Sequence, residues 1–212
     1  MVRRPSIRIL KGRRSADRRG AVCRLFIIDG AKALTKAIRR TFGRHVPIQR
    51  CQIHKARNIM ERLPKPLHPS VRRALRQAWE MGDPDKAEKL IRNLARRLEH
   101  DAPGVAASIL EGLDEILTVS RLRLPNELRR SLACTNIIEN MMGTVRRVCC
   151  NVKRWRSAST ALRWTAAAML EATKGFRRLK AHKQLHRLRA ALQAHRNGTA
   201  AEPSVAADAR AA

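Results

Sequence analysis

Chemically reactive side chains occur at suggestive spacings in short stretches of this 212-residue chain. The first is Asp29-Gly30, which directly follows the apolar run VCRLFII at 22–28. Such a run is typical of a buried strand, and a carboxylate at the end of a strand lies where α/β folds build their sites. A lone Asp-Gly pair is more often a simple turn, so Asp29 is a candidate that needs a partner.

The second stretch is Cys51-Gln52-Ile53-His54. A C-x-x-H pair can supply half of a zinc site, but no second pair follows at ligand spacing. The adjacent Cys149 and Cys150 are no matching half, because neighbouring helical side chains point about 100° apart. We therefore expect a structural role, in which His54 braces the loop or hydrogen-bonds a neighbouring carboxylate, rather than zinc binding.

The third stretch is TNIIEN at 135–140. Asn136 followed three residues later by Glu139 is a capping-box arrangement, which gives the glutamate a ready structural task at the start of a helix. Taken alone, this capping role is the simpler interpretation. The alternative is that Glu139 is a catalytic or metal-binding carboxylate.

The elements that must position these residues follow from the hydrophobic pattern. A strand at 22–28, a helix at 31–43, a second short strand at 45–51 and a helix at 52–63 form an α/β signature. Helices are then predicted at 69–81, 82–100 and 103–118, with another starting at Pro125. Of these, 82–100 has the clearest apolar stripe at three- and four-residue spacing.

The last part of the chain is also expected to be helical. One helix starts near Asn136, and a long helical pattern continues from Ser157 to about His195. We expect the apolar side chains of Trp164, Leu170 and Phe176 to pack in the core or between helices.

Composition points to a polyanionic partner. The chain has 46 Lys and Arg against 17 Asp and Glu, a formal net charge of +29, which favours nucleic acid. No stretch approaches the ~18 consecutive apolar residues of a membrane span, so no membrane association is expected. The odd count of five cysteines, with no disulfide-type spacing, suggests a reducing, cytoplasmic setting.

The positive charge concentrates late in the chain. Residues 144–196 contain fourteen Lys and Arg and a single acid. A tryptophan lies within a basic run there, as in many phosphate-contacting surfaces. The predicted DNA-binding residues are Arg146, Arg147, Lys153, Arg154, Trp155 and Arg156.

Several segments together resemble the mutator-type transposases of bacterial insertion sequences. They are RLFIIDGAKALTKAIRRTFG, IQRCQIHKARNIMERLPK, TNIIENMMGTVRRV, NVKRWR and LEATKGFRRLK, in the family's order and spacing from about Arg24 to His186. The resemblance implies a ribonuclease-H-like fold with a large helical insertion before its last acidic residue. It also implies metal-dependent DNA strand cleavage and transfer by a DDE site.

The resemblance assigns roles to individual residues. Asp29 matches the second catalytic aspartate and Glu139 the final glutamate, and both would hold Mg²⁺ or Mn²⁺. Supporting roles fall to Cys51 and His54, which match a C-x-x-H signature near the site, and to Asn136 and Asn140, which flank Glu139 in its motif. The resemblance then implies double-stranded DNA, at the element ends and at the target, as the partner and an association with the bacterial nucleoid, with a homo-oligomer as a further expectation.

One departure from the family matters for activity. The family's first aspartate precedes the second by many residues, whereas the only acid before Asp29 here is Asp17, in an Arg-rich stretch without a strand pattern. We therefore expect a truncated, catalytically impaired copy that still binds DNA. The alternative is a non-catalytic basic nucleic-acid-binding protein, which would have no need of converging carboxylates.

The predicted fold class is thus α/β, a partial ribonuclease-H-like fold with an all-helical insertion and a helical C-terminal region, predominantly helical overall. The expected divisions are a basic disordered arm at 1–21, the α/β segment at 22–66, the insertion at 67–134, the catalytic-glutamate helix and basic helices at 135–197, and a disordered tail at 198–212.

Overall fold

The computed structural model describes residues 22–200; the predicted arm at 1–21 and positions 201–212 of the predicted tail lie outside the described residues. The chain is predominantly helical with one two-stranded parallel sheet. Its elements are β1 (Phe26–Ile28), α1 (Lys32–Phe42), β2 (Ile48–Arg50), α2 (Gln52–Arg62), the 3-10 turn η1 (Lys65–Leu67), α3 (His68–Glu80), α4 (Pro84–Leu98), α5 (Pro103–Leu110), α6 (Leu113–Ile116), α7 (Thr118–Arg121), α8 (Asn126–Leu132), α9 (Asn136–Cys149), α10 (Ala158–Thr173), the 3-10 turn η2 (His182–Gln184) and α11 (Leu185–Ala200).

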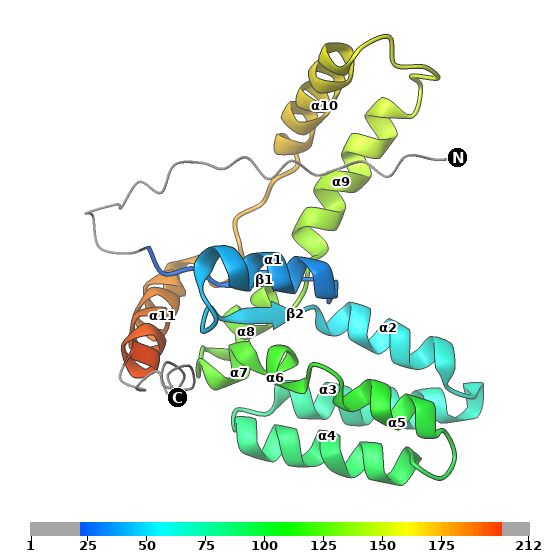
Figure 1. The fold of residues 1–212 in the computed structure, drawn as a ribbon, viewed down its shortest axis with the longest axis vertical. Coiled ribbons are helices and arrows are strands. Elements are labelled where there is room, and N and C mark those ends of the chain that lie inside the picture. Colours follow the sequence, from blue (N-terminus) through cyan, green and yellow to red (C-terminus); the bar gives the residue numbers. More distant parts are fainter. Residues whose placement is uncertain (1–21, 201–212) are drawn as a thin grey trace, which may run out of the picture.

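The sheet is covered on both faces, which explains its apolar sequence. The strands are parallel, with Phe26 opposite Ile48 and Ile28 opposite Arg50. Side chains alternate between the faces of a strand. Ile28 and Ile48 pack with Ile38 of α1, whereas Leu25 and Ile27 pack on a cluster from α7, α8 and α11. In Figure 1 α1 accordingly lies on one side of the strands, and α7 and α8 lie on the other.

Helices α2 to α5 build a separate core beside the sheet. The predicted stripe of α4 is confirmed, since Ile91, Leu94 and Leu98 are buried against α2, α3 and α5. Asp83 caps α4 by accepting hydrogen bonds from the N–H groups of Asp85 and Lys86, with Pro84 in the first turn.

Two buried polar side chains tie neighbouring elements together: Gln49 links β2 to α6 and α7, and Lys55 links α2 to the end of α5. The amide of Gln49 in β2 donates to the carbonyl of Ile116 at 2.8 Å and accepts from the N–H of Val119 at 2.9 Å. The ammonium of Lys55 donates to the carbonyls of Ser108 and Glu111 at the end of α5. Burial lowers the pKa of Lys55 to about 8. These contacts satisfy buried donors and hold α2, α5 and β2 in one arrangement.

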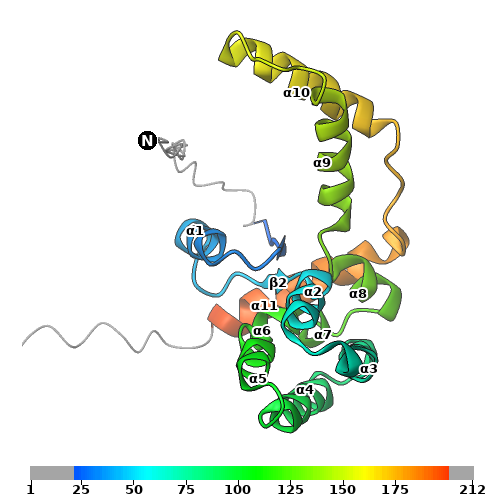
Figure 2. The same cartoon turned by 90° about the vertical axis from the view of Figure 1, so that its right-hand side faces the viewer.

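Helices α9 and α10 form an antiparallel hairpin that extends away from the rest of the molecule (Figures 1 and 2). After α10 the chain returns to the body, where Leu179, Leu188 and Ala191 pack against the cluster beneath β1. The hairpin is therefore attached to the body at two places: at the start of α9, and through the segment after α10 that leads into α11.

The structure corrects several expected element boundaries. Both strands are shorter than predicted, at three residues each. The helix expected at 103–118 is three short helices, because Gly112 adopts a left-handed conformation (φ 69°) that ends the first of them. The pattern from Ser157 to His195 is also interrupted, between α10 and α11, and α11 continues through 198–200, the first residues of the predicted tail.

Trp164, Leu170 and Phe176, expected in the core or between helices, are not core residues. Their exposed fractions are 40%, 69% and 55%. Trp164 and Leu170 lie on α10, which packs along α9 but has no other layer over it (Figure 2). None of the helices within 22–200 has the length and apolar character needed to cross a membrane.

The buried Lys55 predicts a pH-dependent stability. Its folded-state pKa of about 8 lies below the value of about 10.5 expected in the unfolded chain, so between these values the unfolded chain binds more protons. This lysine should therefore make the free energy of unfolding rise as pH increases from about 8 to 10. Urea denaturation should show that rise reduced in Lys55→Met and unchanged in the exposed control Lys36→Met. Identical pH profiles for Lys55→Met and wild type would contradict the assignment.

Candidate functional site

The site begins at the carboxyl edge of the two-stranded sheet. The N–H of Cys51, the first residue after β2, donates to the carbonyl of Ile28, the last residue of β1, at 2.7 Å. Asp29 follows Ile28 directly, so Asp29 and Cys51 leave the sheet side by side at the same edge. This parallel pairing brings together residues that are 22 positions apart in the sequence.

Asp29 itself is exposed and forms the turn that its sequence suggested. Its Oδ1 accepts from the N–H of Ala31 at 3.0 Å. Gly30 has φ 104°, and because it has no side chain the guanidinium of Arg50 can pack closely against it. Arg50 also donates to the carbonyl of Glu111 at 3.3 Å. The turn that carries Asp29 is thus packed against Arg50, whose side chain is largely buried.

A second long-range backbone contact brings α9 to this edge. The N–H of Gln52, at the start of α2, donates to the carbonyl of Ala133 at 2.9 Å. A helix N-terminus leaves its first N–H groups without intrahelical partners, so this carbonyl satisfies one of them. Cys134 and Thr135 follow immediately and lead into α9. Burial, together with the nearby Cys51 and Glu139, raises the pKa of the Cys134 thiol.

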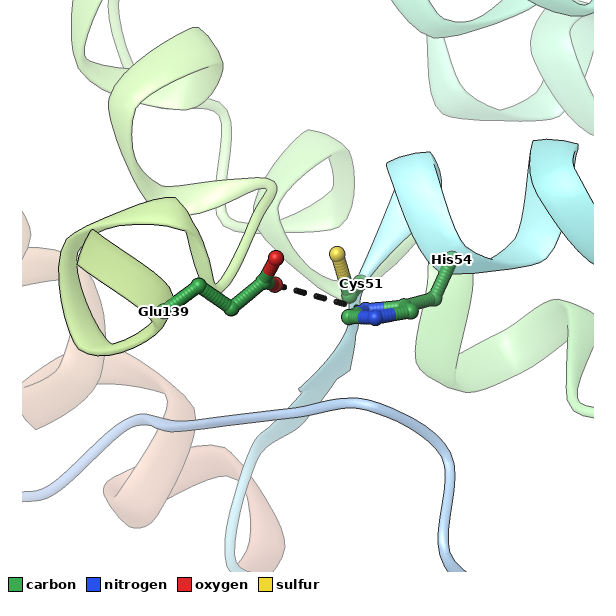
Figure 3. A group of neighbouring side chains, drawn as sticks. All are labelled: Cys51, His54 and Glu139. Carbon is green, nitrogen blue, oxygen red and sulfur yellow. Dashed lines mark ion pairs between the residues drawn. The ribbon is translucent and has the colours of Figure 1, made fainter. Parts of the chain in front are cut away.

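The result is a cluster of three side chains from two segments (Figure 3). One ligand-type atom from each of Cys51, His54 and Glu139 lies within 4.8 Å of the others. His54 Nδ1 is 3.6 Å from Glu139 Oε1, and the hydroxyl of Thr135 donates to the same oxygen at 2.5 Å. Cys51 is fully buried, whereas the side chains of His54 and Glu139 are 25% and 44% exposed. We refer to Cys51, His54 and Glu139 as the CHE cluster.

The predicted capping box is not formed. Helix α9 begins at Asn136 with Thr135 as its N-cap, and no side chain makes a capping hydrogen bond. The Glu139 carboxylate is instead directed to Thr135 and His54, which leaves it a role outside helix capping. Asn136 and Asn140 lie on the same first turns of α9 and are exposed. Sequence reasoning missed Thr135, Arg50 and Cys134, whose only signal was proximity to the motifs.

The predicted DNA-binding residues lie on the hairpin. Arg146 and Arg147 are on α9, and the remaining four are in the connection between α9 and α10. All six are exposed, and among the ion pairs of residues 22–200 none involves these cations. The hairpin therefore has the CHE cluster at its base and exposed basic side chains toward its far end.

Comparison with known proteins gives the family of this chain. Residues 15–178 match the family described as transposase, mutator family. Since that match covers most of the chain, the protein belongs to the mutator family of transposases.

Curated relatives are transposases of insertion elements. Over 134 residues the chain is 34% identical to the transposase for insertion sequence element IS6120 of Mycolicibacterium smegmatis, which covers 63% of this chain and 41% of that protein. It is 30% identical to the transposase for IST2 of Acidithiobacillus ferrooxidans, covering 65% of this chain and 46% of that one. It is 29% identical to the transposase for IS256 in transposon Tn4001 of Staphylococcus aureus, covering 69% and 37%. The chain thus spans less than half the length of each, and no solved structure matches it.

The packing of Arg50 over the Asp29 turn is testable. Gly30→Ala should lower the free energy of unfolding by about 1–3 kcal/mol, because the new methyl group meets Arg50 and the positive φ is strained. The matched control is Gly143→Ala in α9, where open space surrounds the glycine and a gain of roughly 0.5–1 kcal/mol is expected. Urea denaturation of both variants measures these changes. A Gly30→Ala protein as stable as wild type would show that Arg50 does not hold this turn.

Proposed function

We propose that this chain supplies part of the metal-dependent DNA strand-cleavage and strand-transfer site of an insertion-element transposase, together with a surface for the DNA. The observation that carries the proposal is the placement of Glu139. A residue 110 positions after Asp29 meets Cys51 and His54, and Cys51 pairs with the strand that ends at Asp29. A protein that merely bound nucleic acid would not require that convergence.

The donor set fits the divalent ion that the family resemblance implies. Mg²⁺ prefers carboxylate oxygens and retains several waters, so it needs accessible acids. Asp29 is exposed where it follows β1, and Glu139 is 44% exposed beside Cys51, the residue that follows β2. These two residues would hold the ion. When bound, it supplies charge stabilisation for in-line displacement at a phosphodiester and lowers the pKa of a bound water.

The protein's own groups prepare the carboxylates. The Thr135 hydroxyl fixes one Glu139 oxygen, and His54 Nδ1 faces that same oxygen, so the side chain is held before DNA arrives. Arg50 holds the Asp29 turn in the same way through Gly30. Preorganised first contacts of this kind reduce the cost of aligning a reacting group.

We assign the α/β part to a partial ribonuclease-H-like fold on three features. It has parallel strands, an acid directly after the first of them, and a helical unit inserted before the late glutamate. The unit of helices α2 to α5 lies beside the sheet and returns the chain through Ala133. That return places α9 at the carboxyl edge.

The hairpin supplies a DNA surface that starts at the site. From Glu139 to the end of α9 at Cys149 the helix rises about 15 Å, at about 1.5 Å per residue. That length corresponds to roughly four base pairs of duplex at about 3.4 Å each. Arg146 and Arg147 are about two turns beyond Glu139, so a phosphate backbone entering the site would pass near them.

DNA binding by the hairpin should be electrostatic and salt-dependent. Each phosphate contact adds about 0.9 to the slope of log affinity against log salt. Alanine at Lys153, Arg154 and Arg156 should weaken duplex binding and reduce that slope by roughly two to three. Replacing the exposed Arg72, Arg73 and Arg97 of α3 and α4 removes the same charge elsewhere and should change the slope less. Fluorescence anisotropy from low to high salt measures both, and equal effects of the two triple variants would contradict a hairpin interface.

Catalysis by this chain alone should be weak. The resemblance implies three carboxylates, and Asp29 and Glu139 match only two of them, with Asp17 a poor substitute for the third. We expect little or no Mg²⁺-dependent cleavage of supercoiled or oligonucleotide DNA. Robust cleavage that Asp29→Asn or Glu139→Gln abolishes would show that the chain needs no further acid. Residual cleavage that both variants leave unchanged would favour the alternative of a purely nucleic-acid-binding protein.

A further inference from the structure

The CHE cluster combines three different donor atoms in one place. Cys51 offers a thiolate sulfur, His54 a ring nitrogen and Glu139 a carboxylate oxygen, all within 4.8 Å of one another. Figure 3 shows the three side chains directed toward a shared space from the start of α2 and the first turns of α9. We propose that this cluster is a binding site for a borderline-soft divalent cation of the Zn²⁺ class.

The spacing is close to what such an ion requires. Zinc takes sulfur at about 2.3 Å and nitrogen or oxygen at about 2.0–2.2 Å in a tetrahedron, so its ligand atoms lie roughly 3.3–3.8 Å apart. The 3.6 Å between His54 Nδ1 and Glu139 Oε1 already falls in this range. The Cys51 sulfur, at most 4.8 Å from either atom, needs to move by about 1 Å or less to complete three corners.

The donor chemistry selects the class of ion. Mg²⁺ and Ca²⁺ take oxygen ligands, whereas a thiolate with an imidazole favours zinc and similar metals. Three protein ligands leave a fourth position for water or for an oxygen of another molecule, as in open zinc sites. Binding converts the Cys51 thiol to a thiolate and releases its proton to solvent.

The surroundings resemble those of a built metal site. The Cys51 backbone is held on both sides, by its N–H to Ile28 and by its carbonyl, which accepts from the Lys55 N–H at 3.1 Å. The Thr135 hydroxyl orients Glu139 at 2.5 Å, the outer-shell hydrogen bond that ligating carboxylates commonly receive. Two of the three ligands are therefore fixed before an ion binds.

The proposal also bears on the proposed function. Glu139 belongs to both the CHE cluster and the pair of acids assigned to Mg²⁺, so an ion held by Cys51 and His54 would compete for it. This consequence rests on the proposed function, but zinc binding itself does not. Asp29→Asn separates the two, since it should leave zinc affinity unchanged while removing any Mg²⁺-dependent reaction.

The test is a titration of the full chain, without DNA, with Zn²⁺ against a chromophoric chelator under metal-free reducing conditions. Wild type should bind one ion per chain in the presence of excess Mg²⁺. His54→Gln and Glu139→Gln, at partly exposed positions, should each lower the affinity by more than the roughly 10–100-fold typical of outer-shell changes. Thr135→Val should fall within that outer-shell range. Affinity should also decrease as pH falls, because the thiol must lose its proton.

Cobalt provides a second readout, which reports directly whether sulfur is a ligand. Co²⁺ bound by wild type should show a sulfur-to-metal charge-transfer band together with tetrahedral d–d bands. The charge-transfer band should be lost in Cys51→Ser and retained in the matched control Cys149→Ser/Cys150→Ser. His100→Gln, which alters an exposed histidine on the helical unit, should also have no effect.

Some results would overturn the assignment. Zinc affinity unchanged by both His54→Gln and Glu139→Gln would do so, as would no stoichiometric binding by wild type. Loss of the cobalt charge-transfer band in Cys134→Ser or in Cys149→Ser/Cys150→Ser, with retention in Cys51→Ser, would place the ion on other cysteines.

Discussion

Two backbone hydrogen bonds, one just after β2 and one at the start of α2, determine where the residues of the CHE cluster and Asp29 lie. The N–H of Cys51 donates to the carbonyl of Ile28, and the N–H of Gln52 donates to the carbonyl of Ala133. Three chain segments therefore meet at two consecutive residues. Both donors would otherwise be orphaned, one at a strand end and one at a helix N-terminus. Satisfying them sets Asp29 beside Cys51 and starts α9 close to His54. The positions of these side chains thus follow from the need to pair buried backbone hydrogen-bonding groups.

The helical unit gives these contacts their precision. A flexible connection of some eighty residues would bring Ala133 to Gln52 only at a large cost in loop-closure entropy. Here the intervening helices have their own core, and buried hydrogen bonds of Gln49 link β2 to α6 and α7, while those of Lys55 link α2 to the end of α5. Part of the closure cost is therefore offset by local packing. The unit of helices α2 to α5 thus helps to fix the start of α9, and with it Glu139, relative to the sheet.

Local patterns predicted the elements better than their meeting points. The stripe of α4, the caps at Asp83 and the acid after β1 follow from short-range rules, and the structure has them. The break at Gly112 was missed because one glycine in an apolar pattern is compatible with a continuous helix. Glu139 was ambiguous for a different reason: its spacing from Asn136 suits a capping box, and only the through-space contact with Thr135 and His54 decides against one. The likeness to known transposases, and not periodicity, linked Asp29 to Glu139.

The C-x-x-H pair shows most clearly why a linear pattern underdetermines a site. Cys51 and His54 lacked a second pair at ligand spacing, which argued against a metal. A metal site requires only donor atoms at the right separations in space, and here the third donor comes from a single glutamate 85 residues after His54. The same glutamate offers a carboxylate oxygen beside a thiol and an imidazole. The donors that the fold gathers around Glu139, more than the identity of Glu139 itself, therefore decide which class of ion would suit this edge of the sheet.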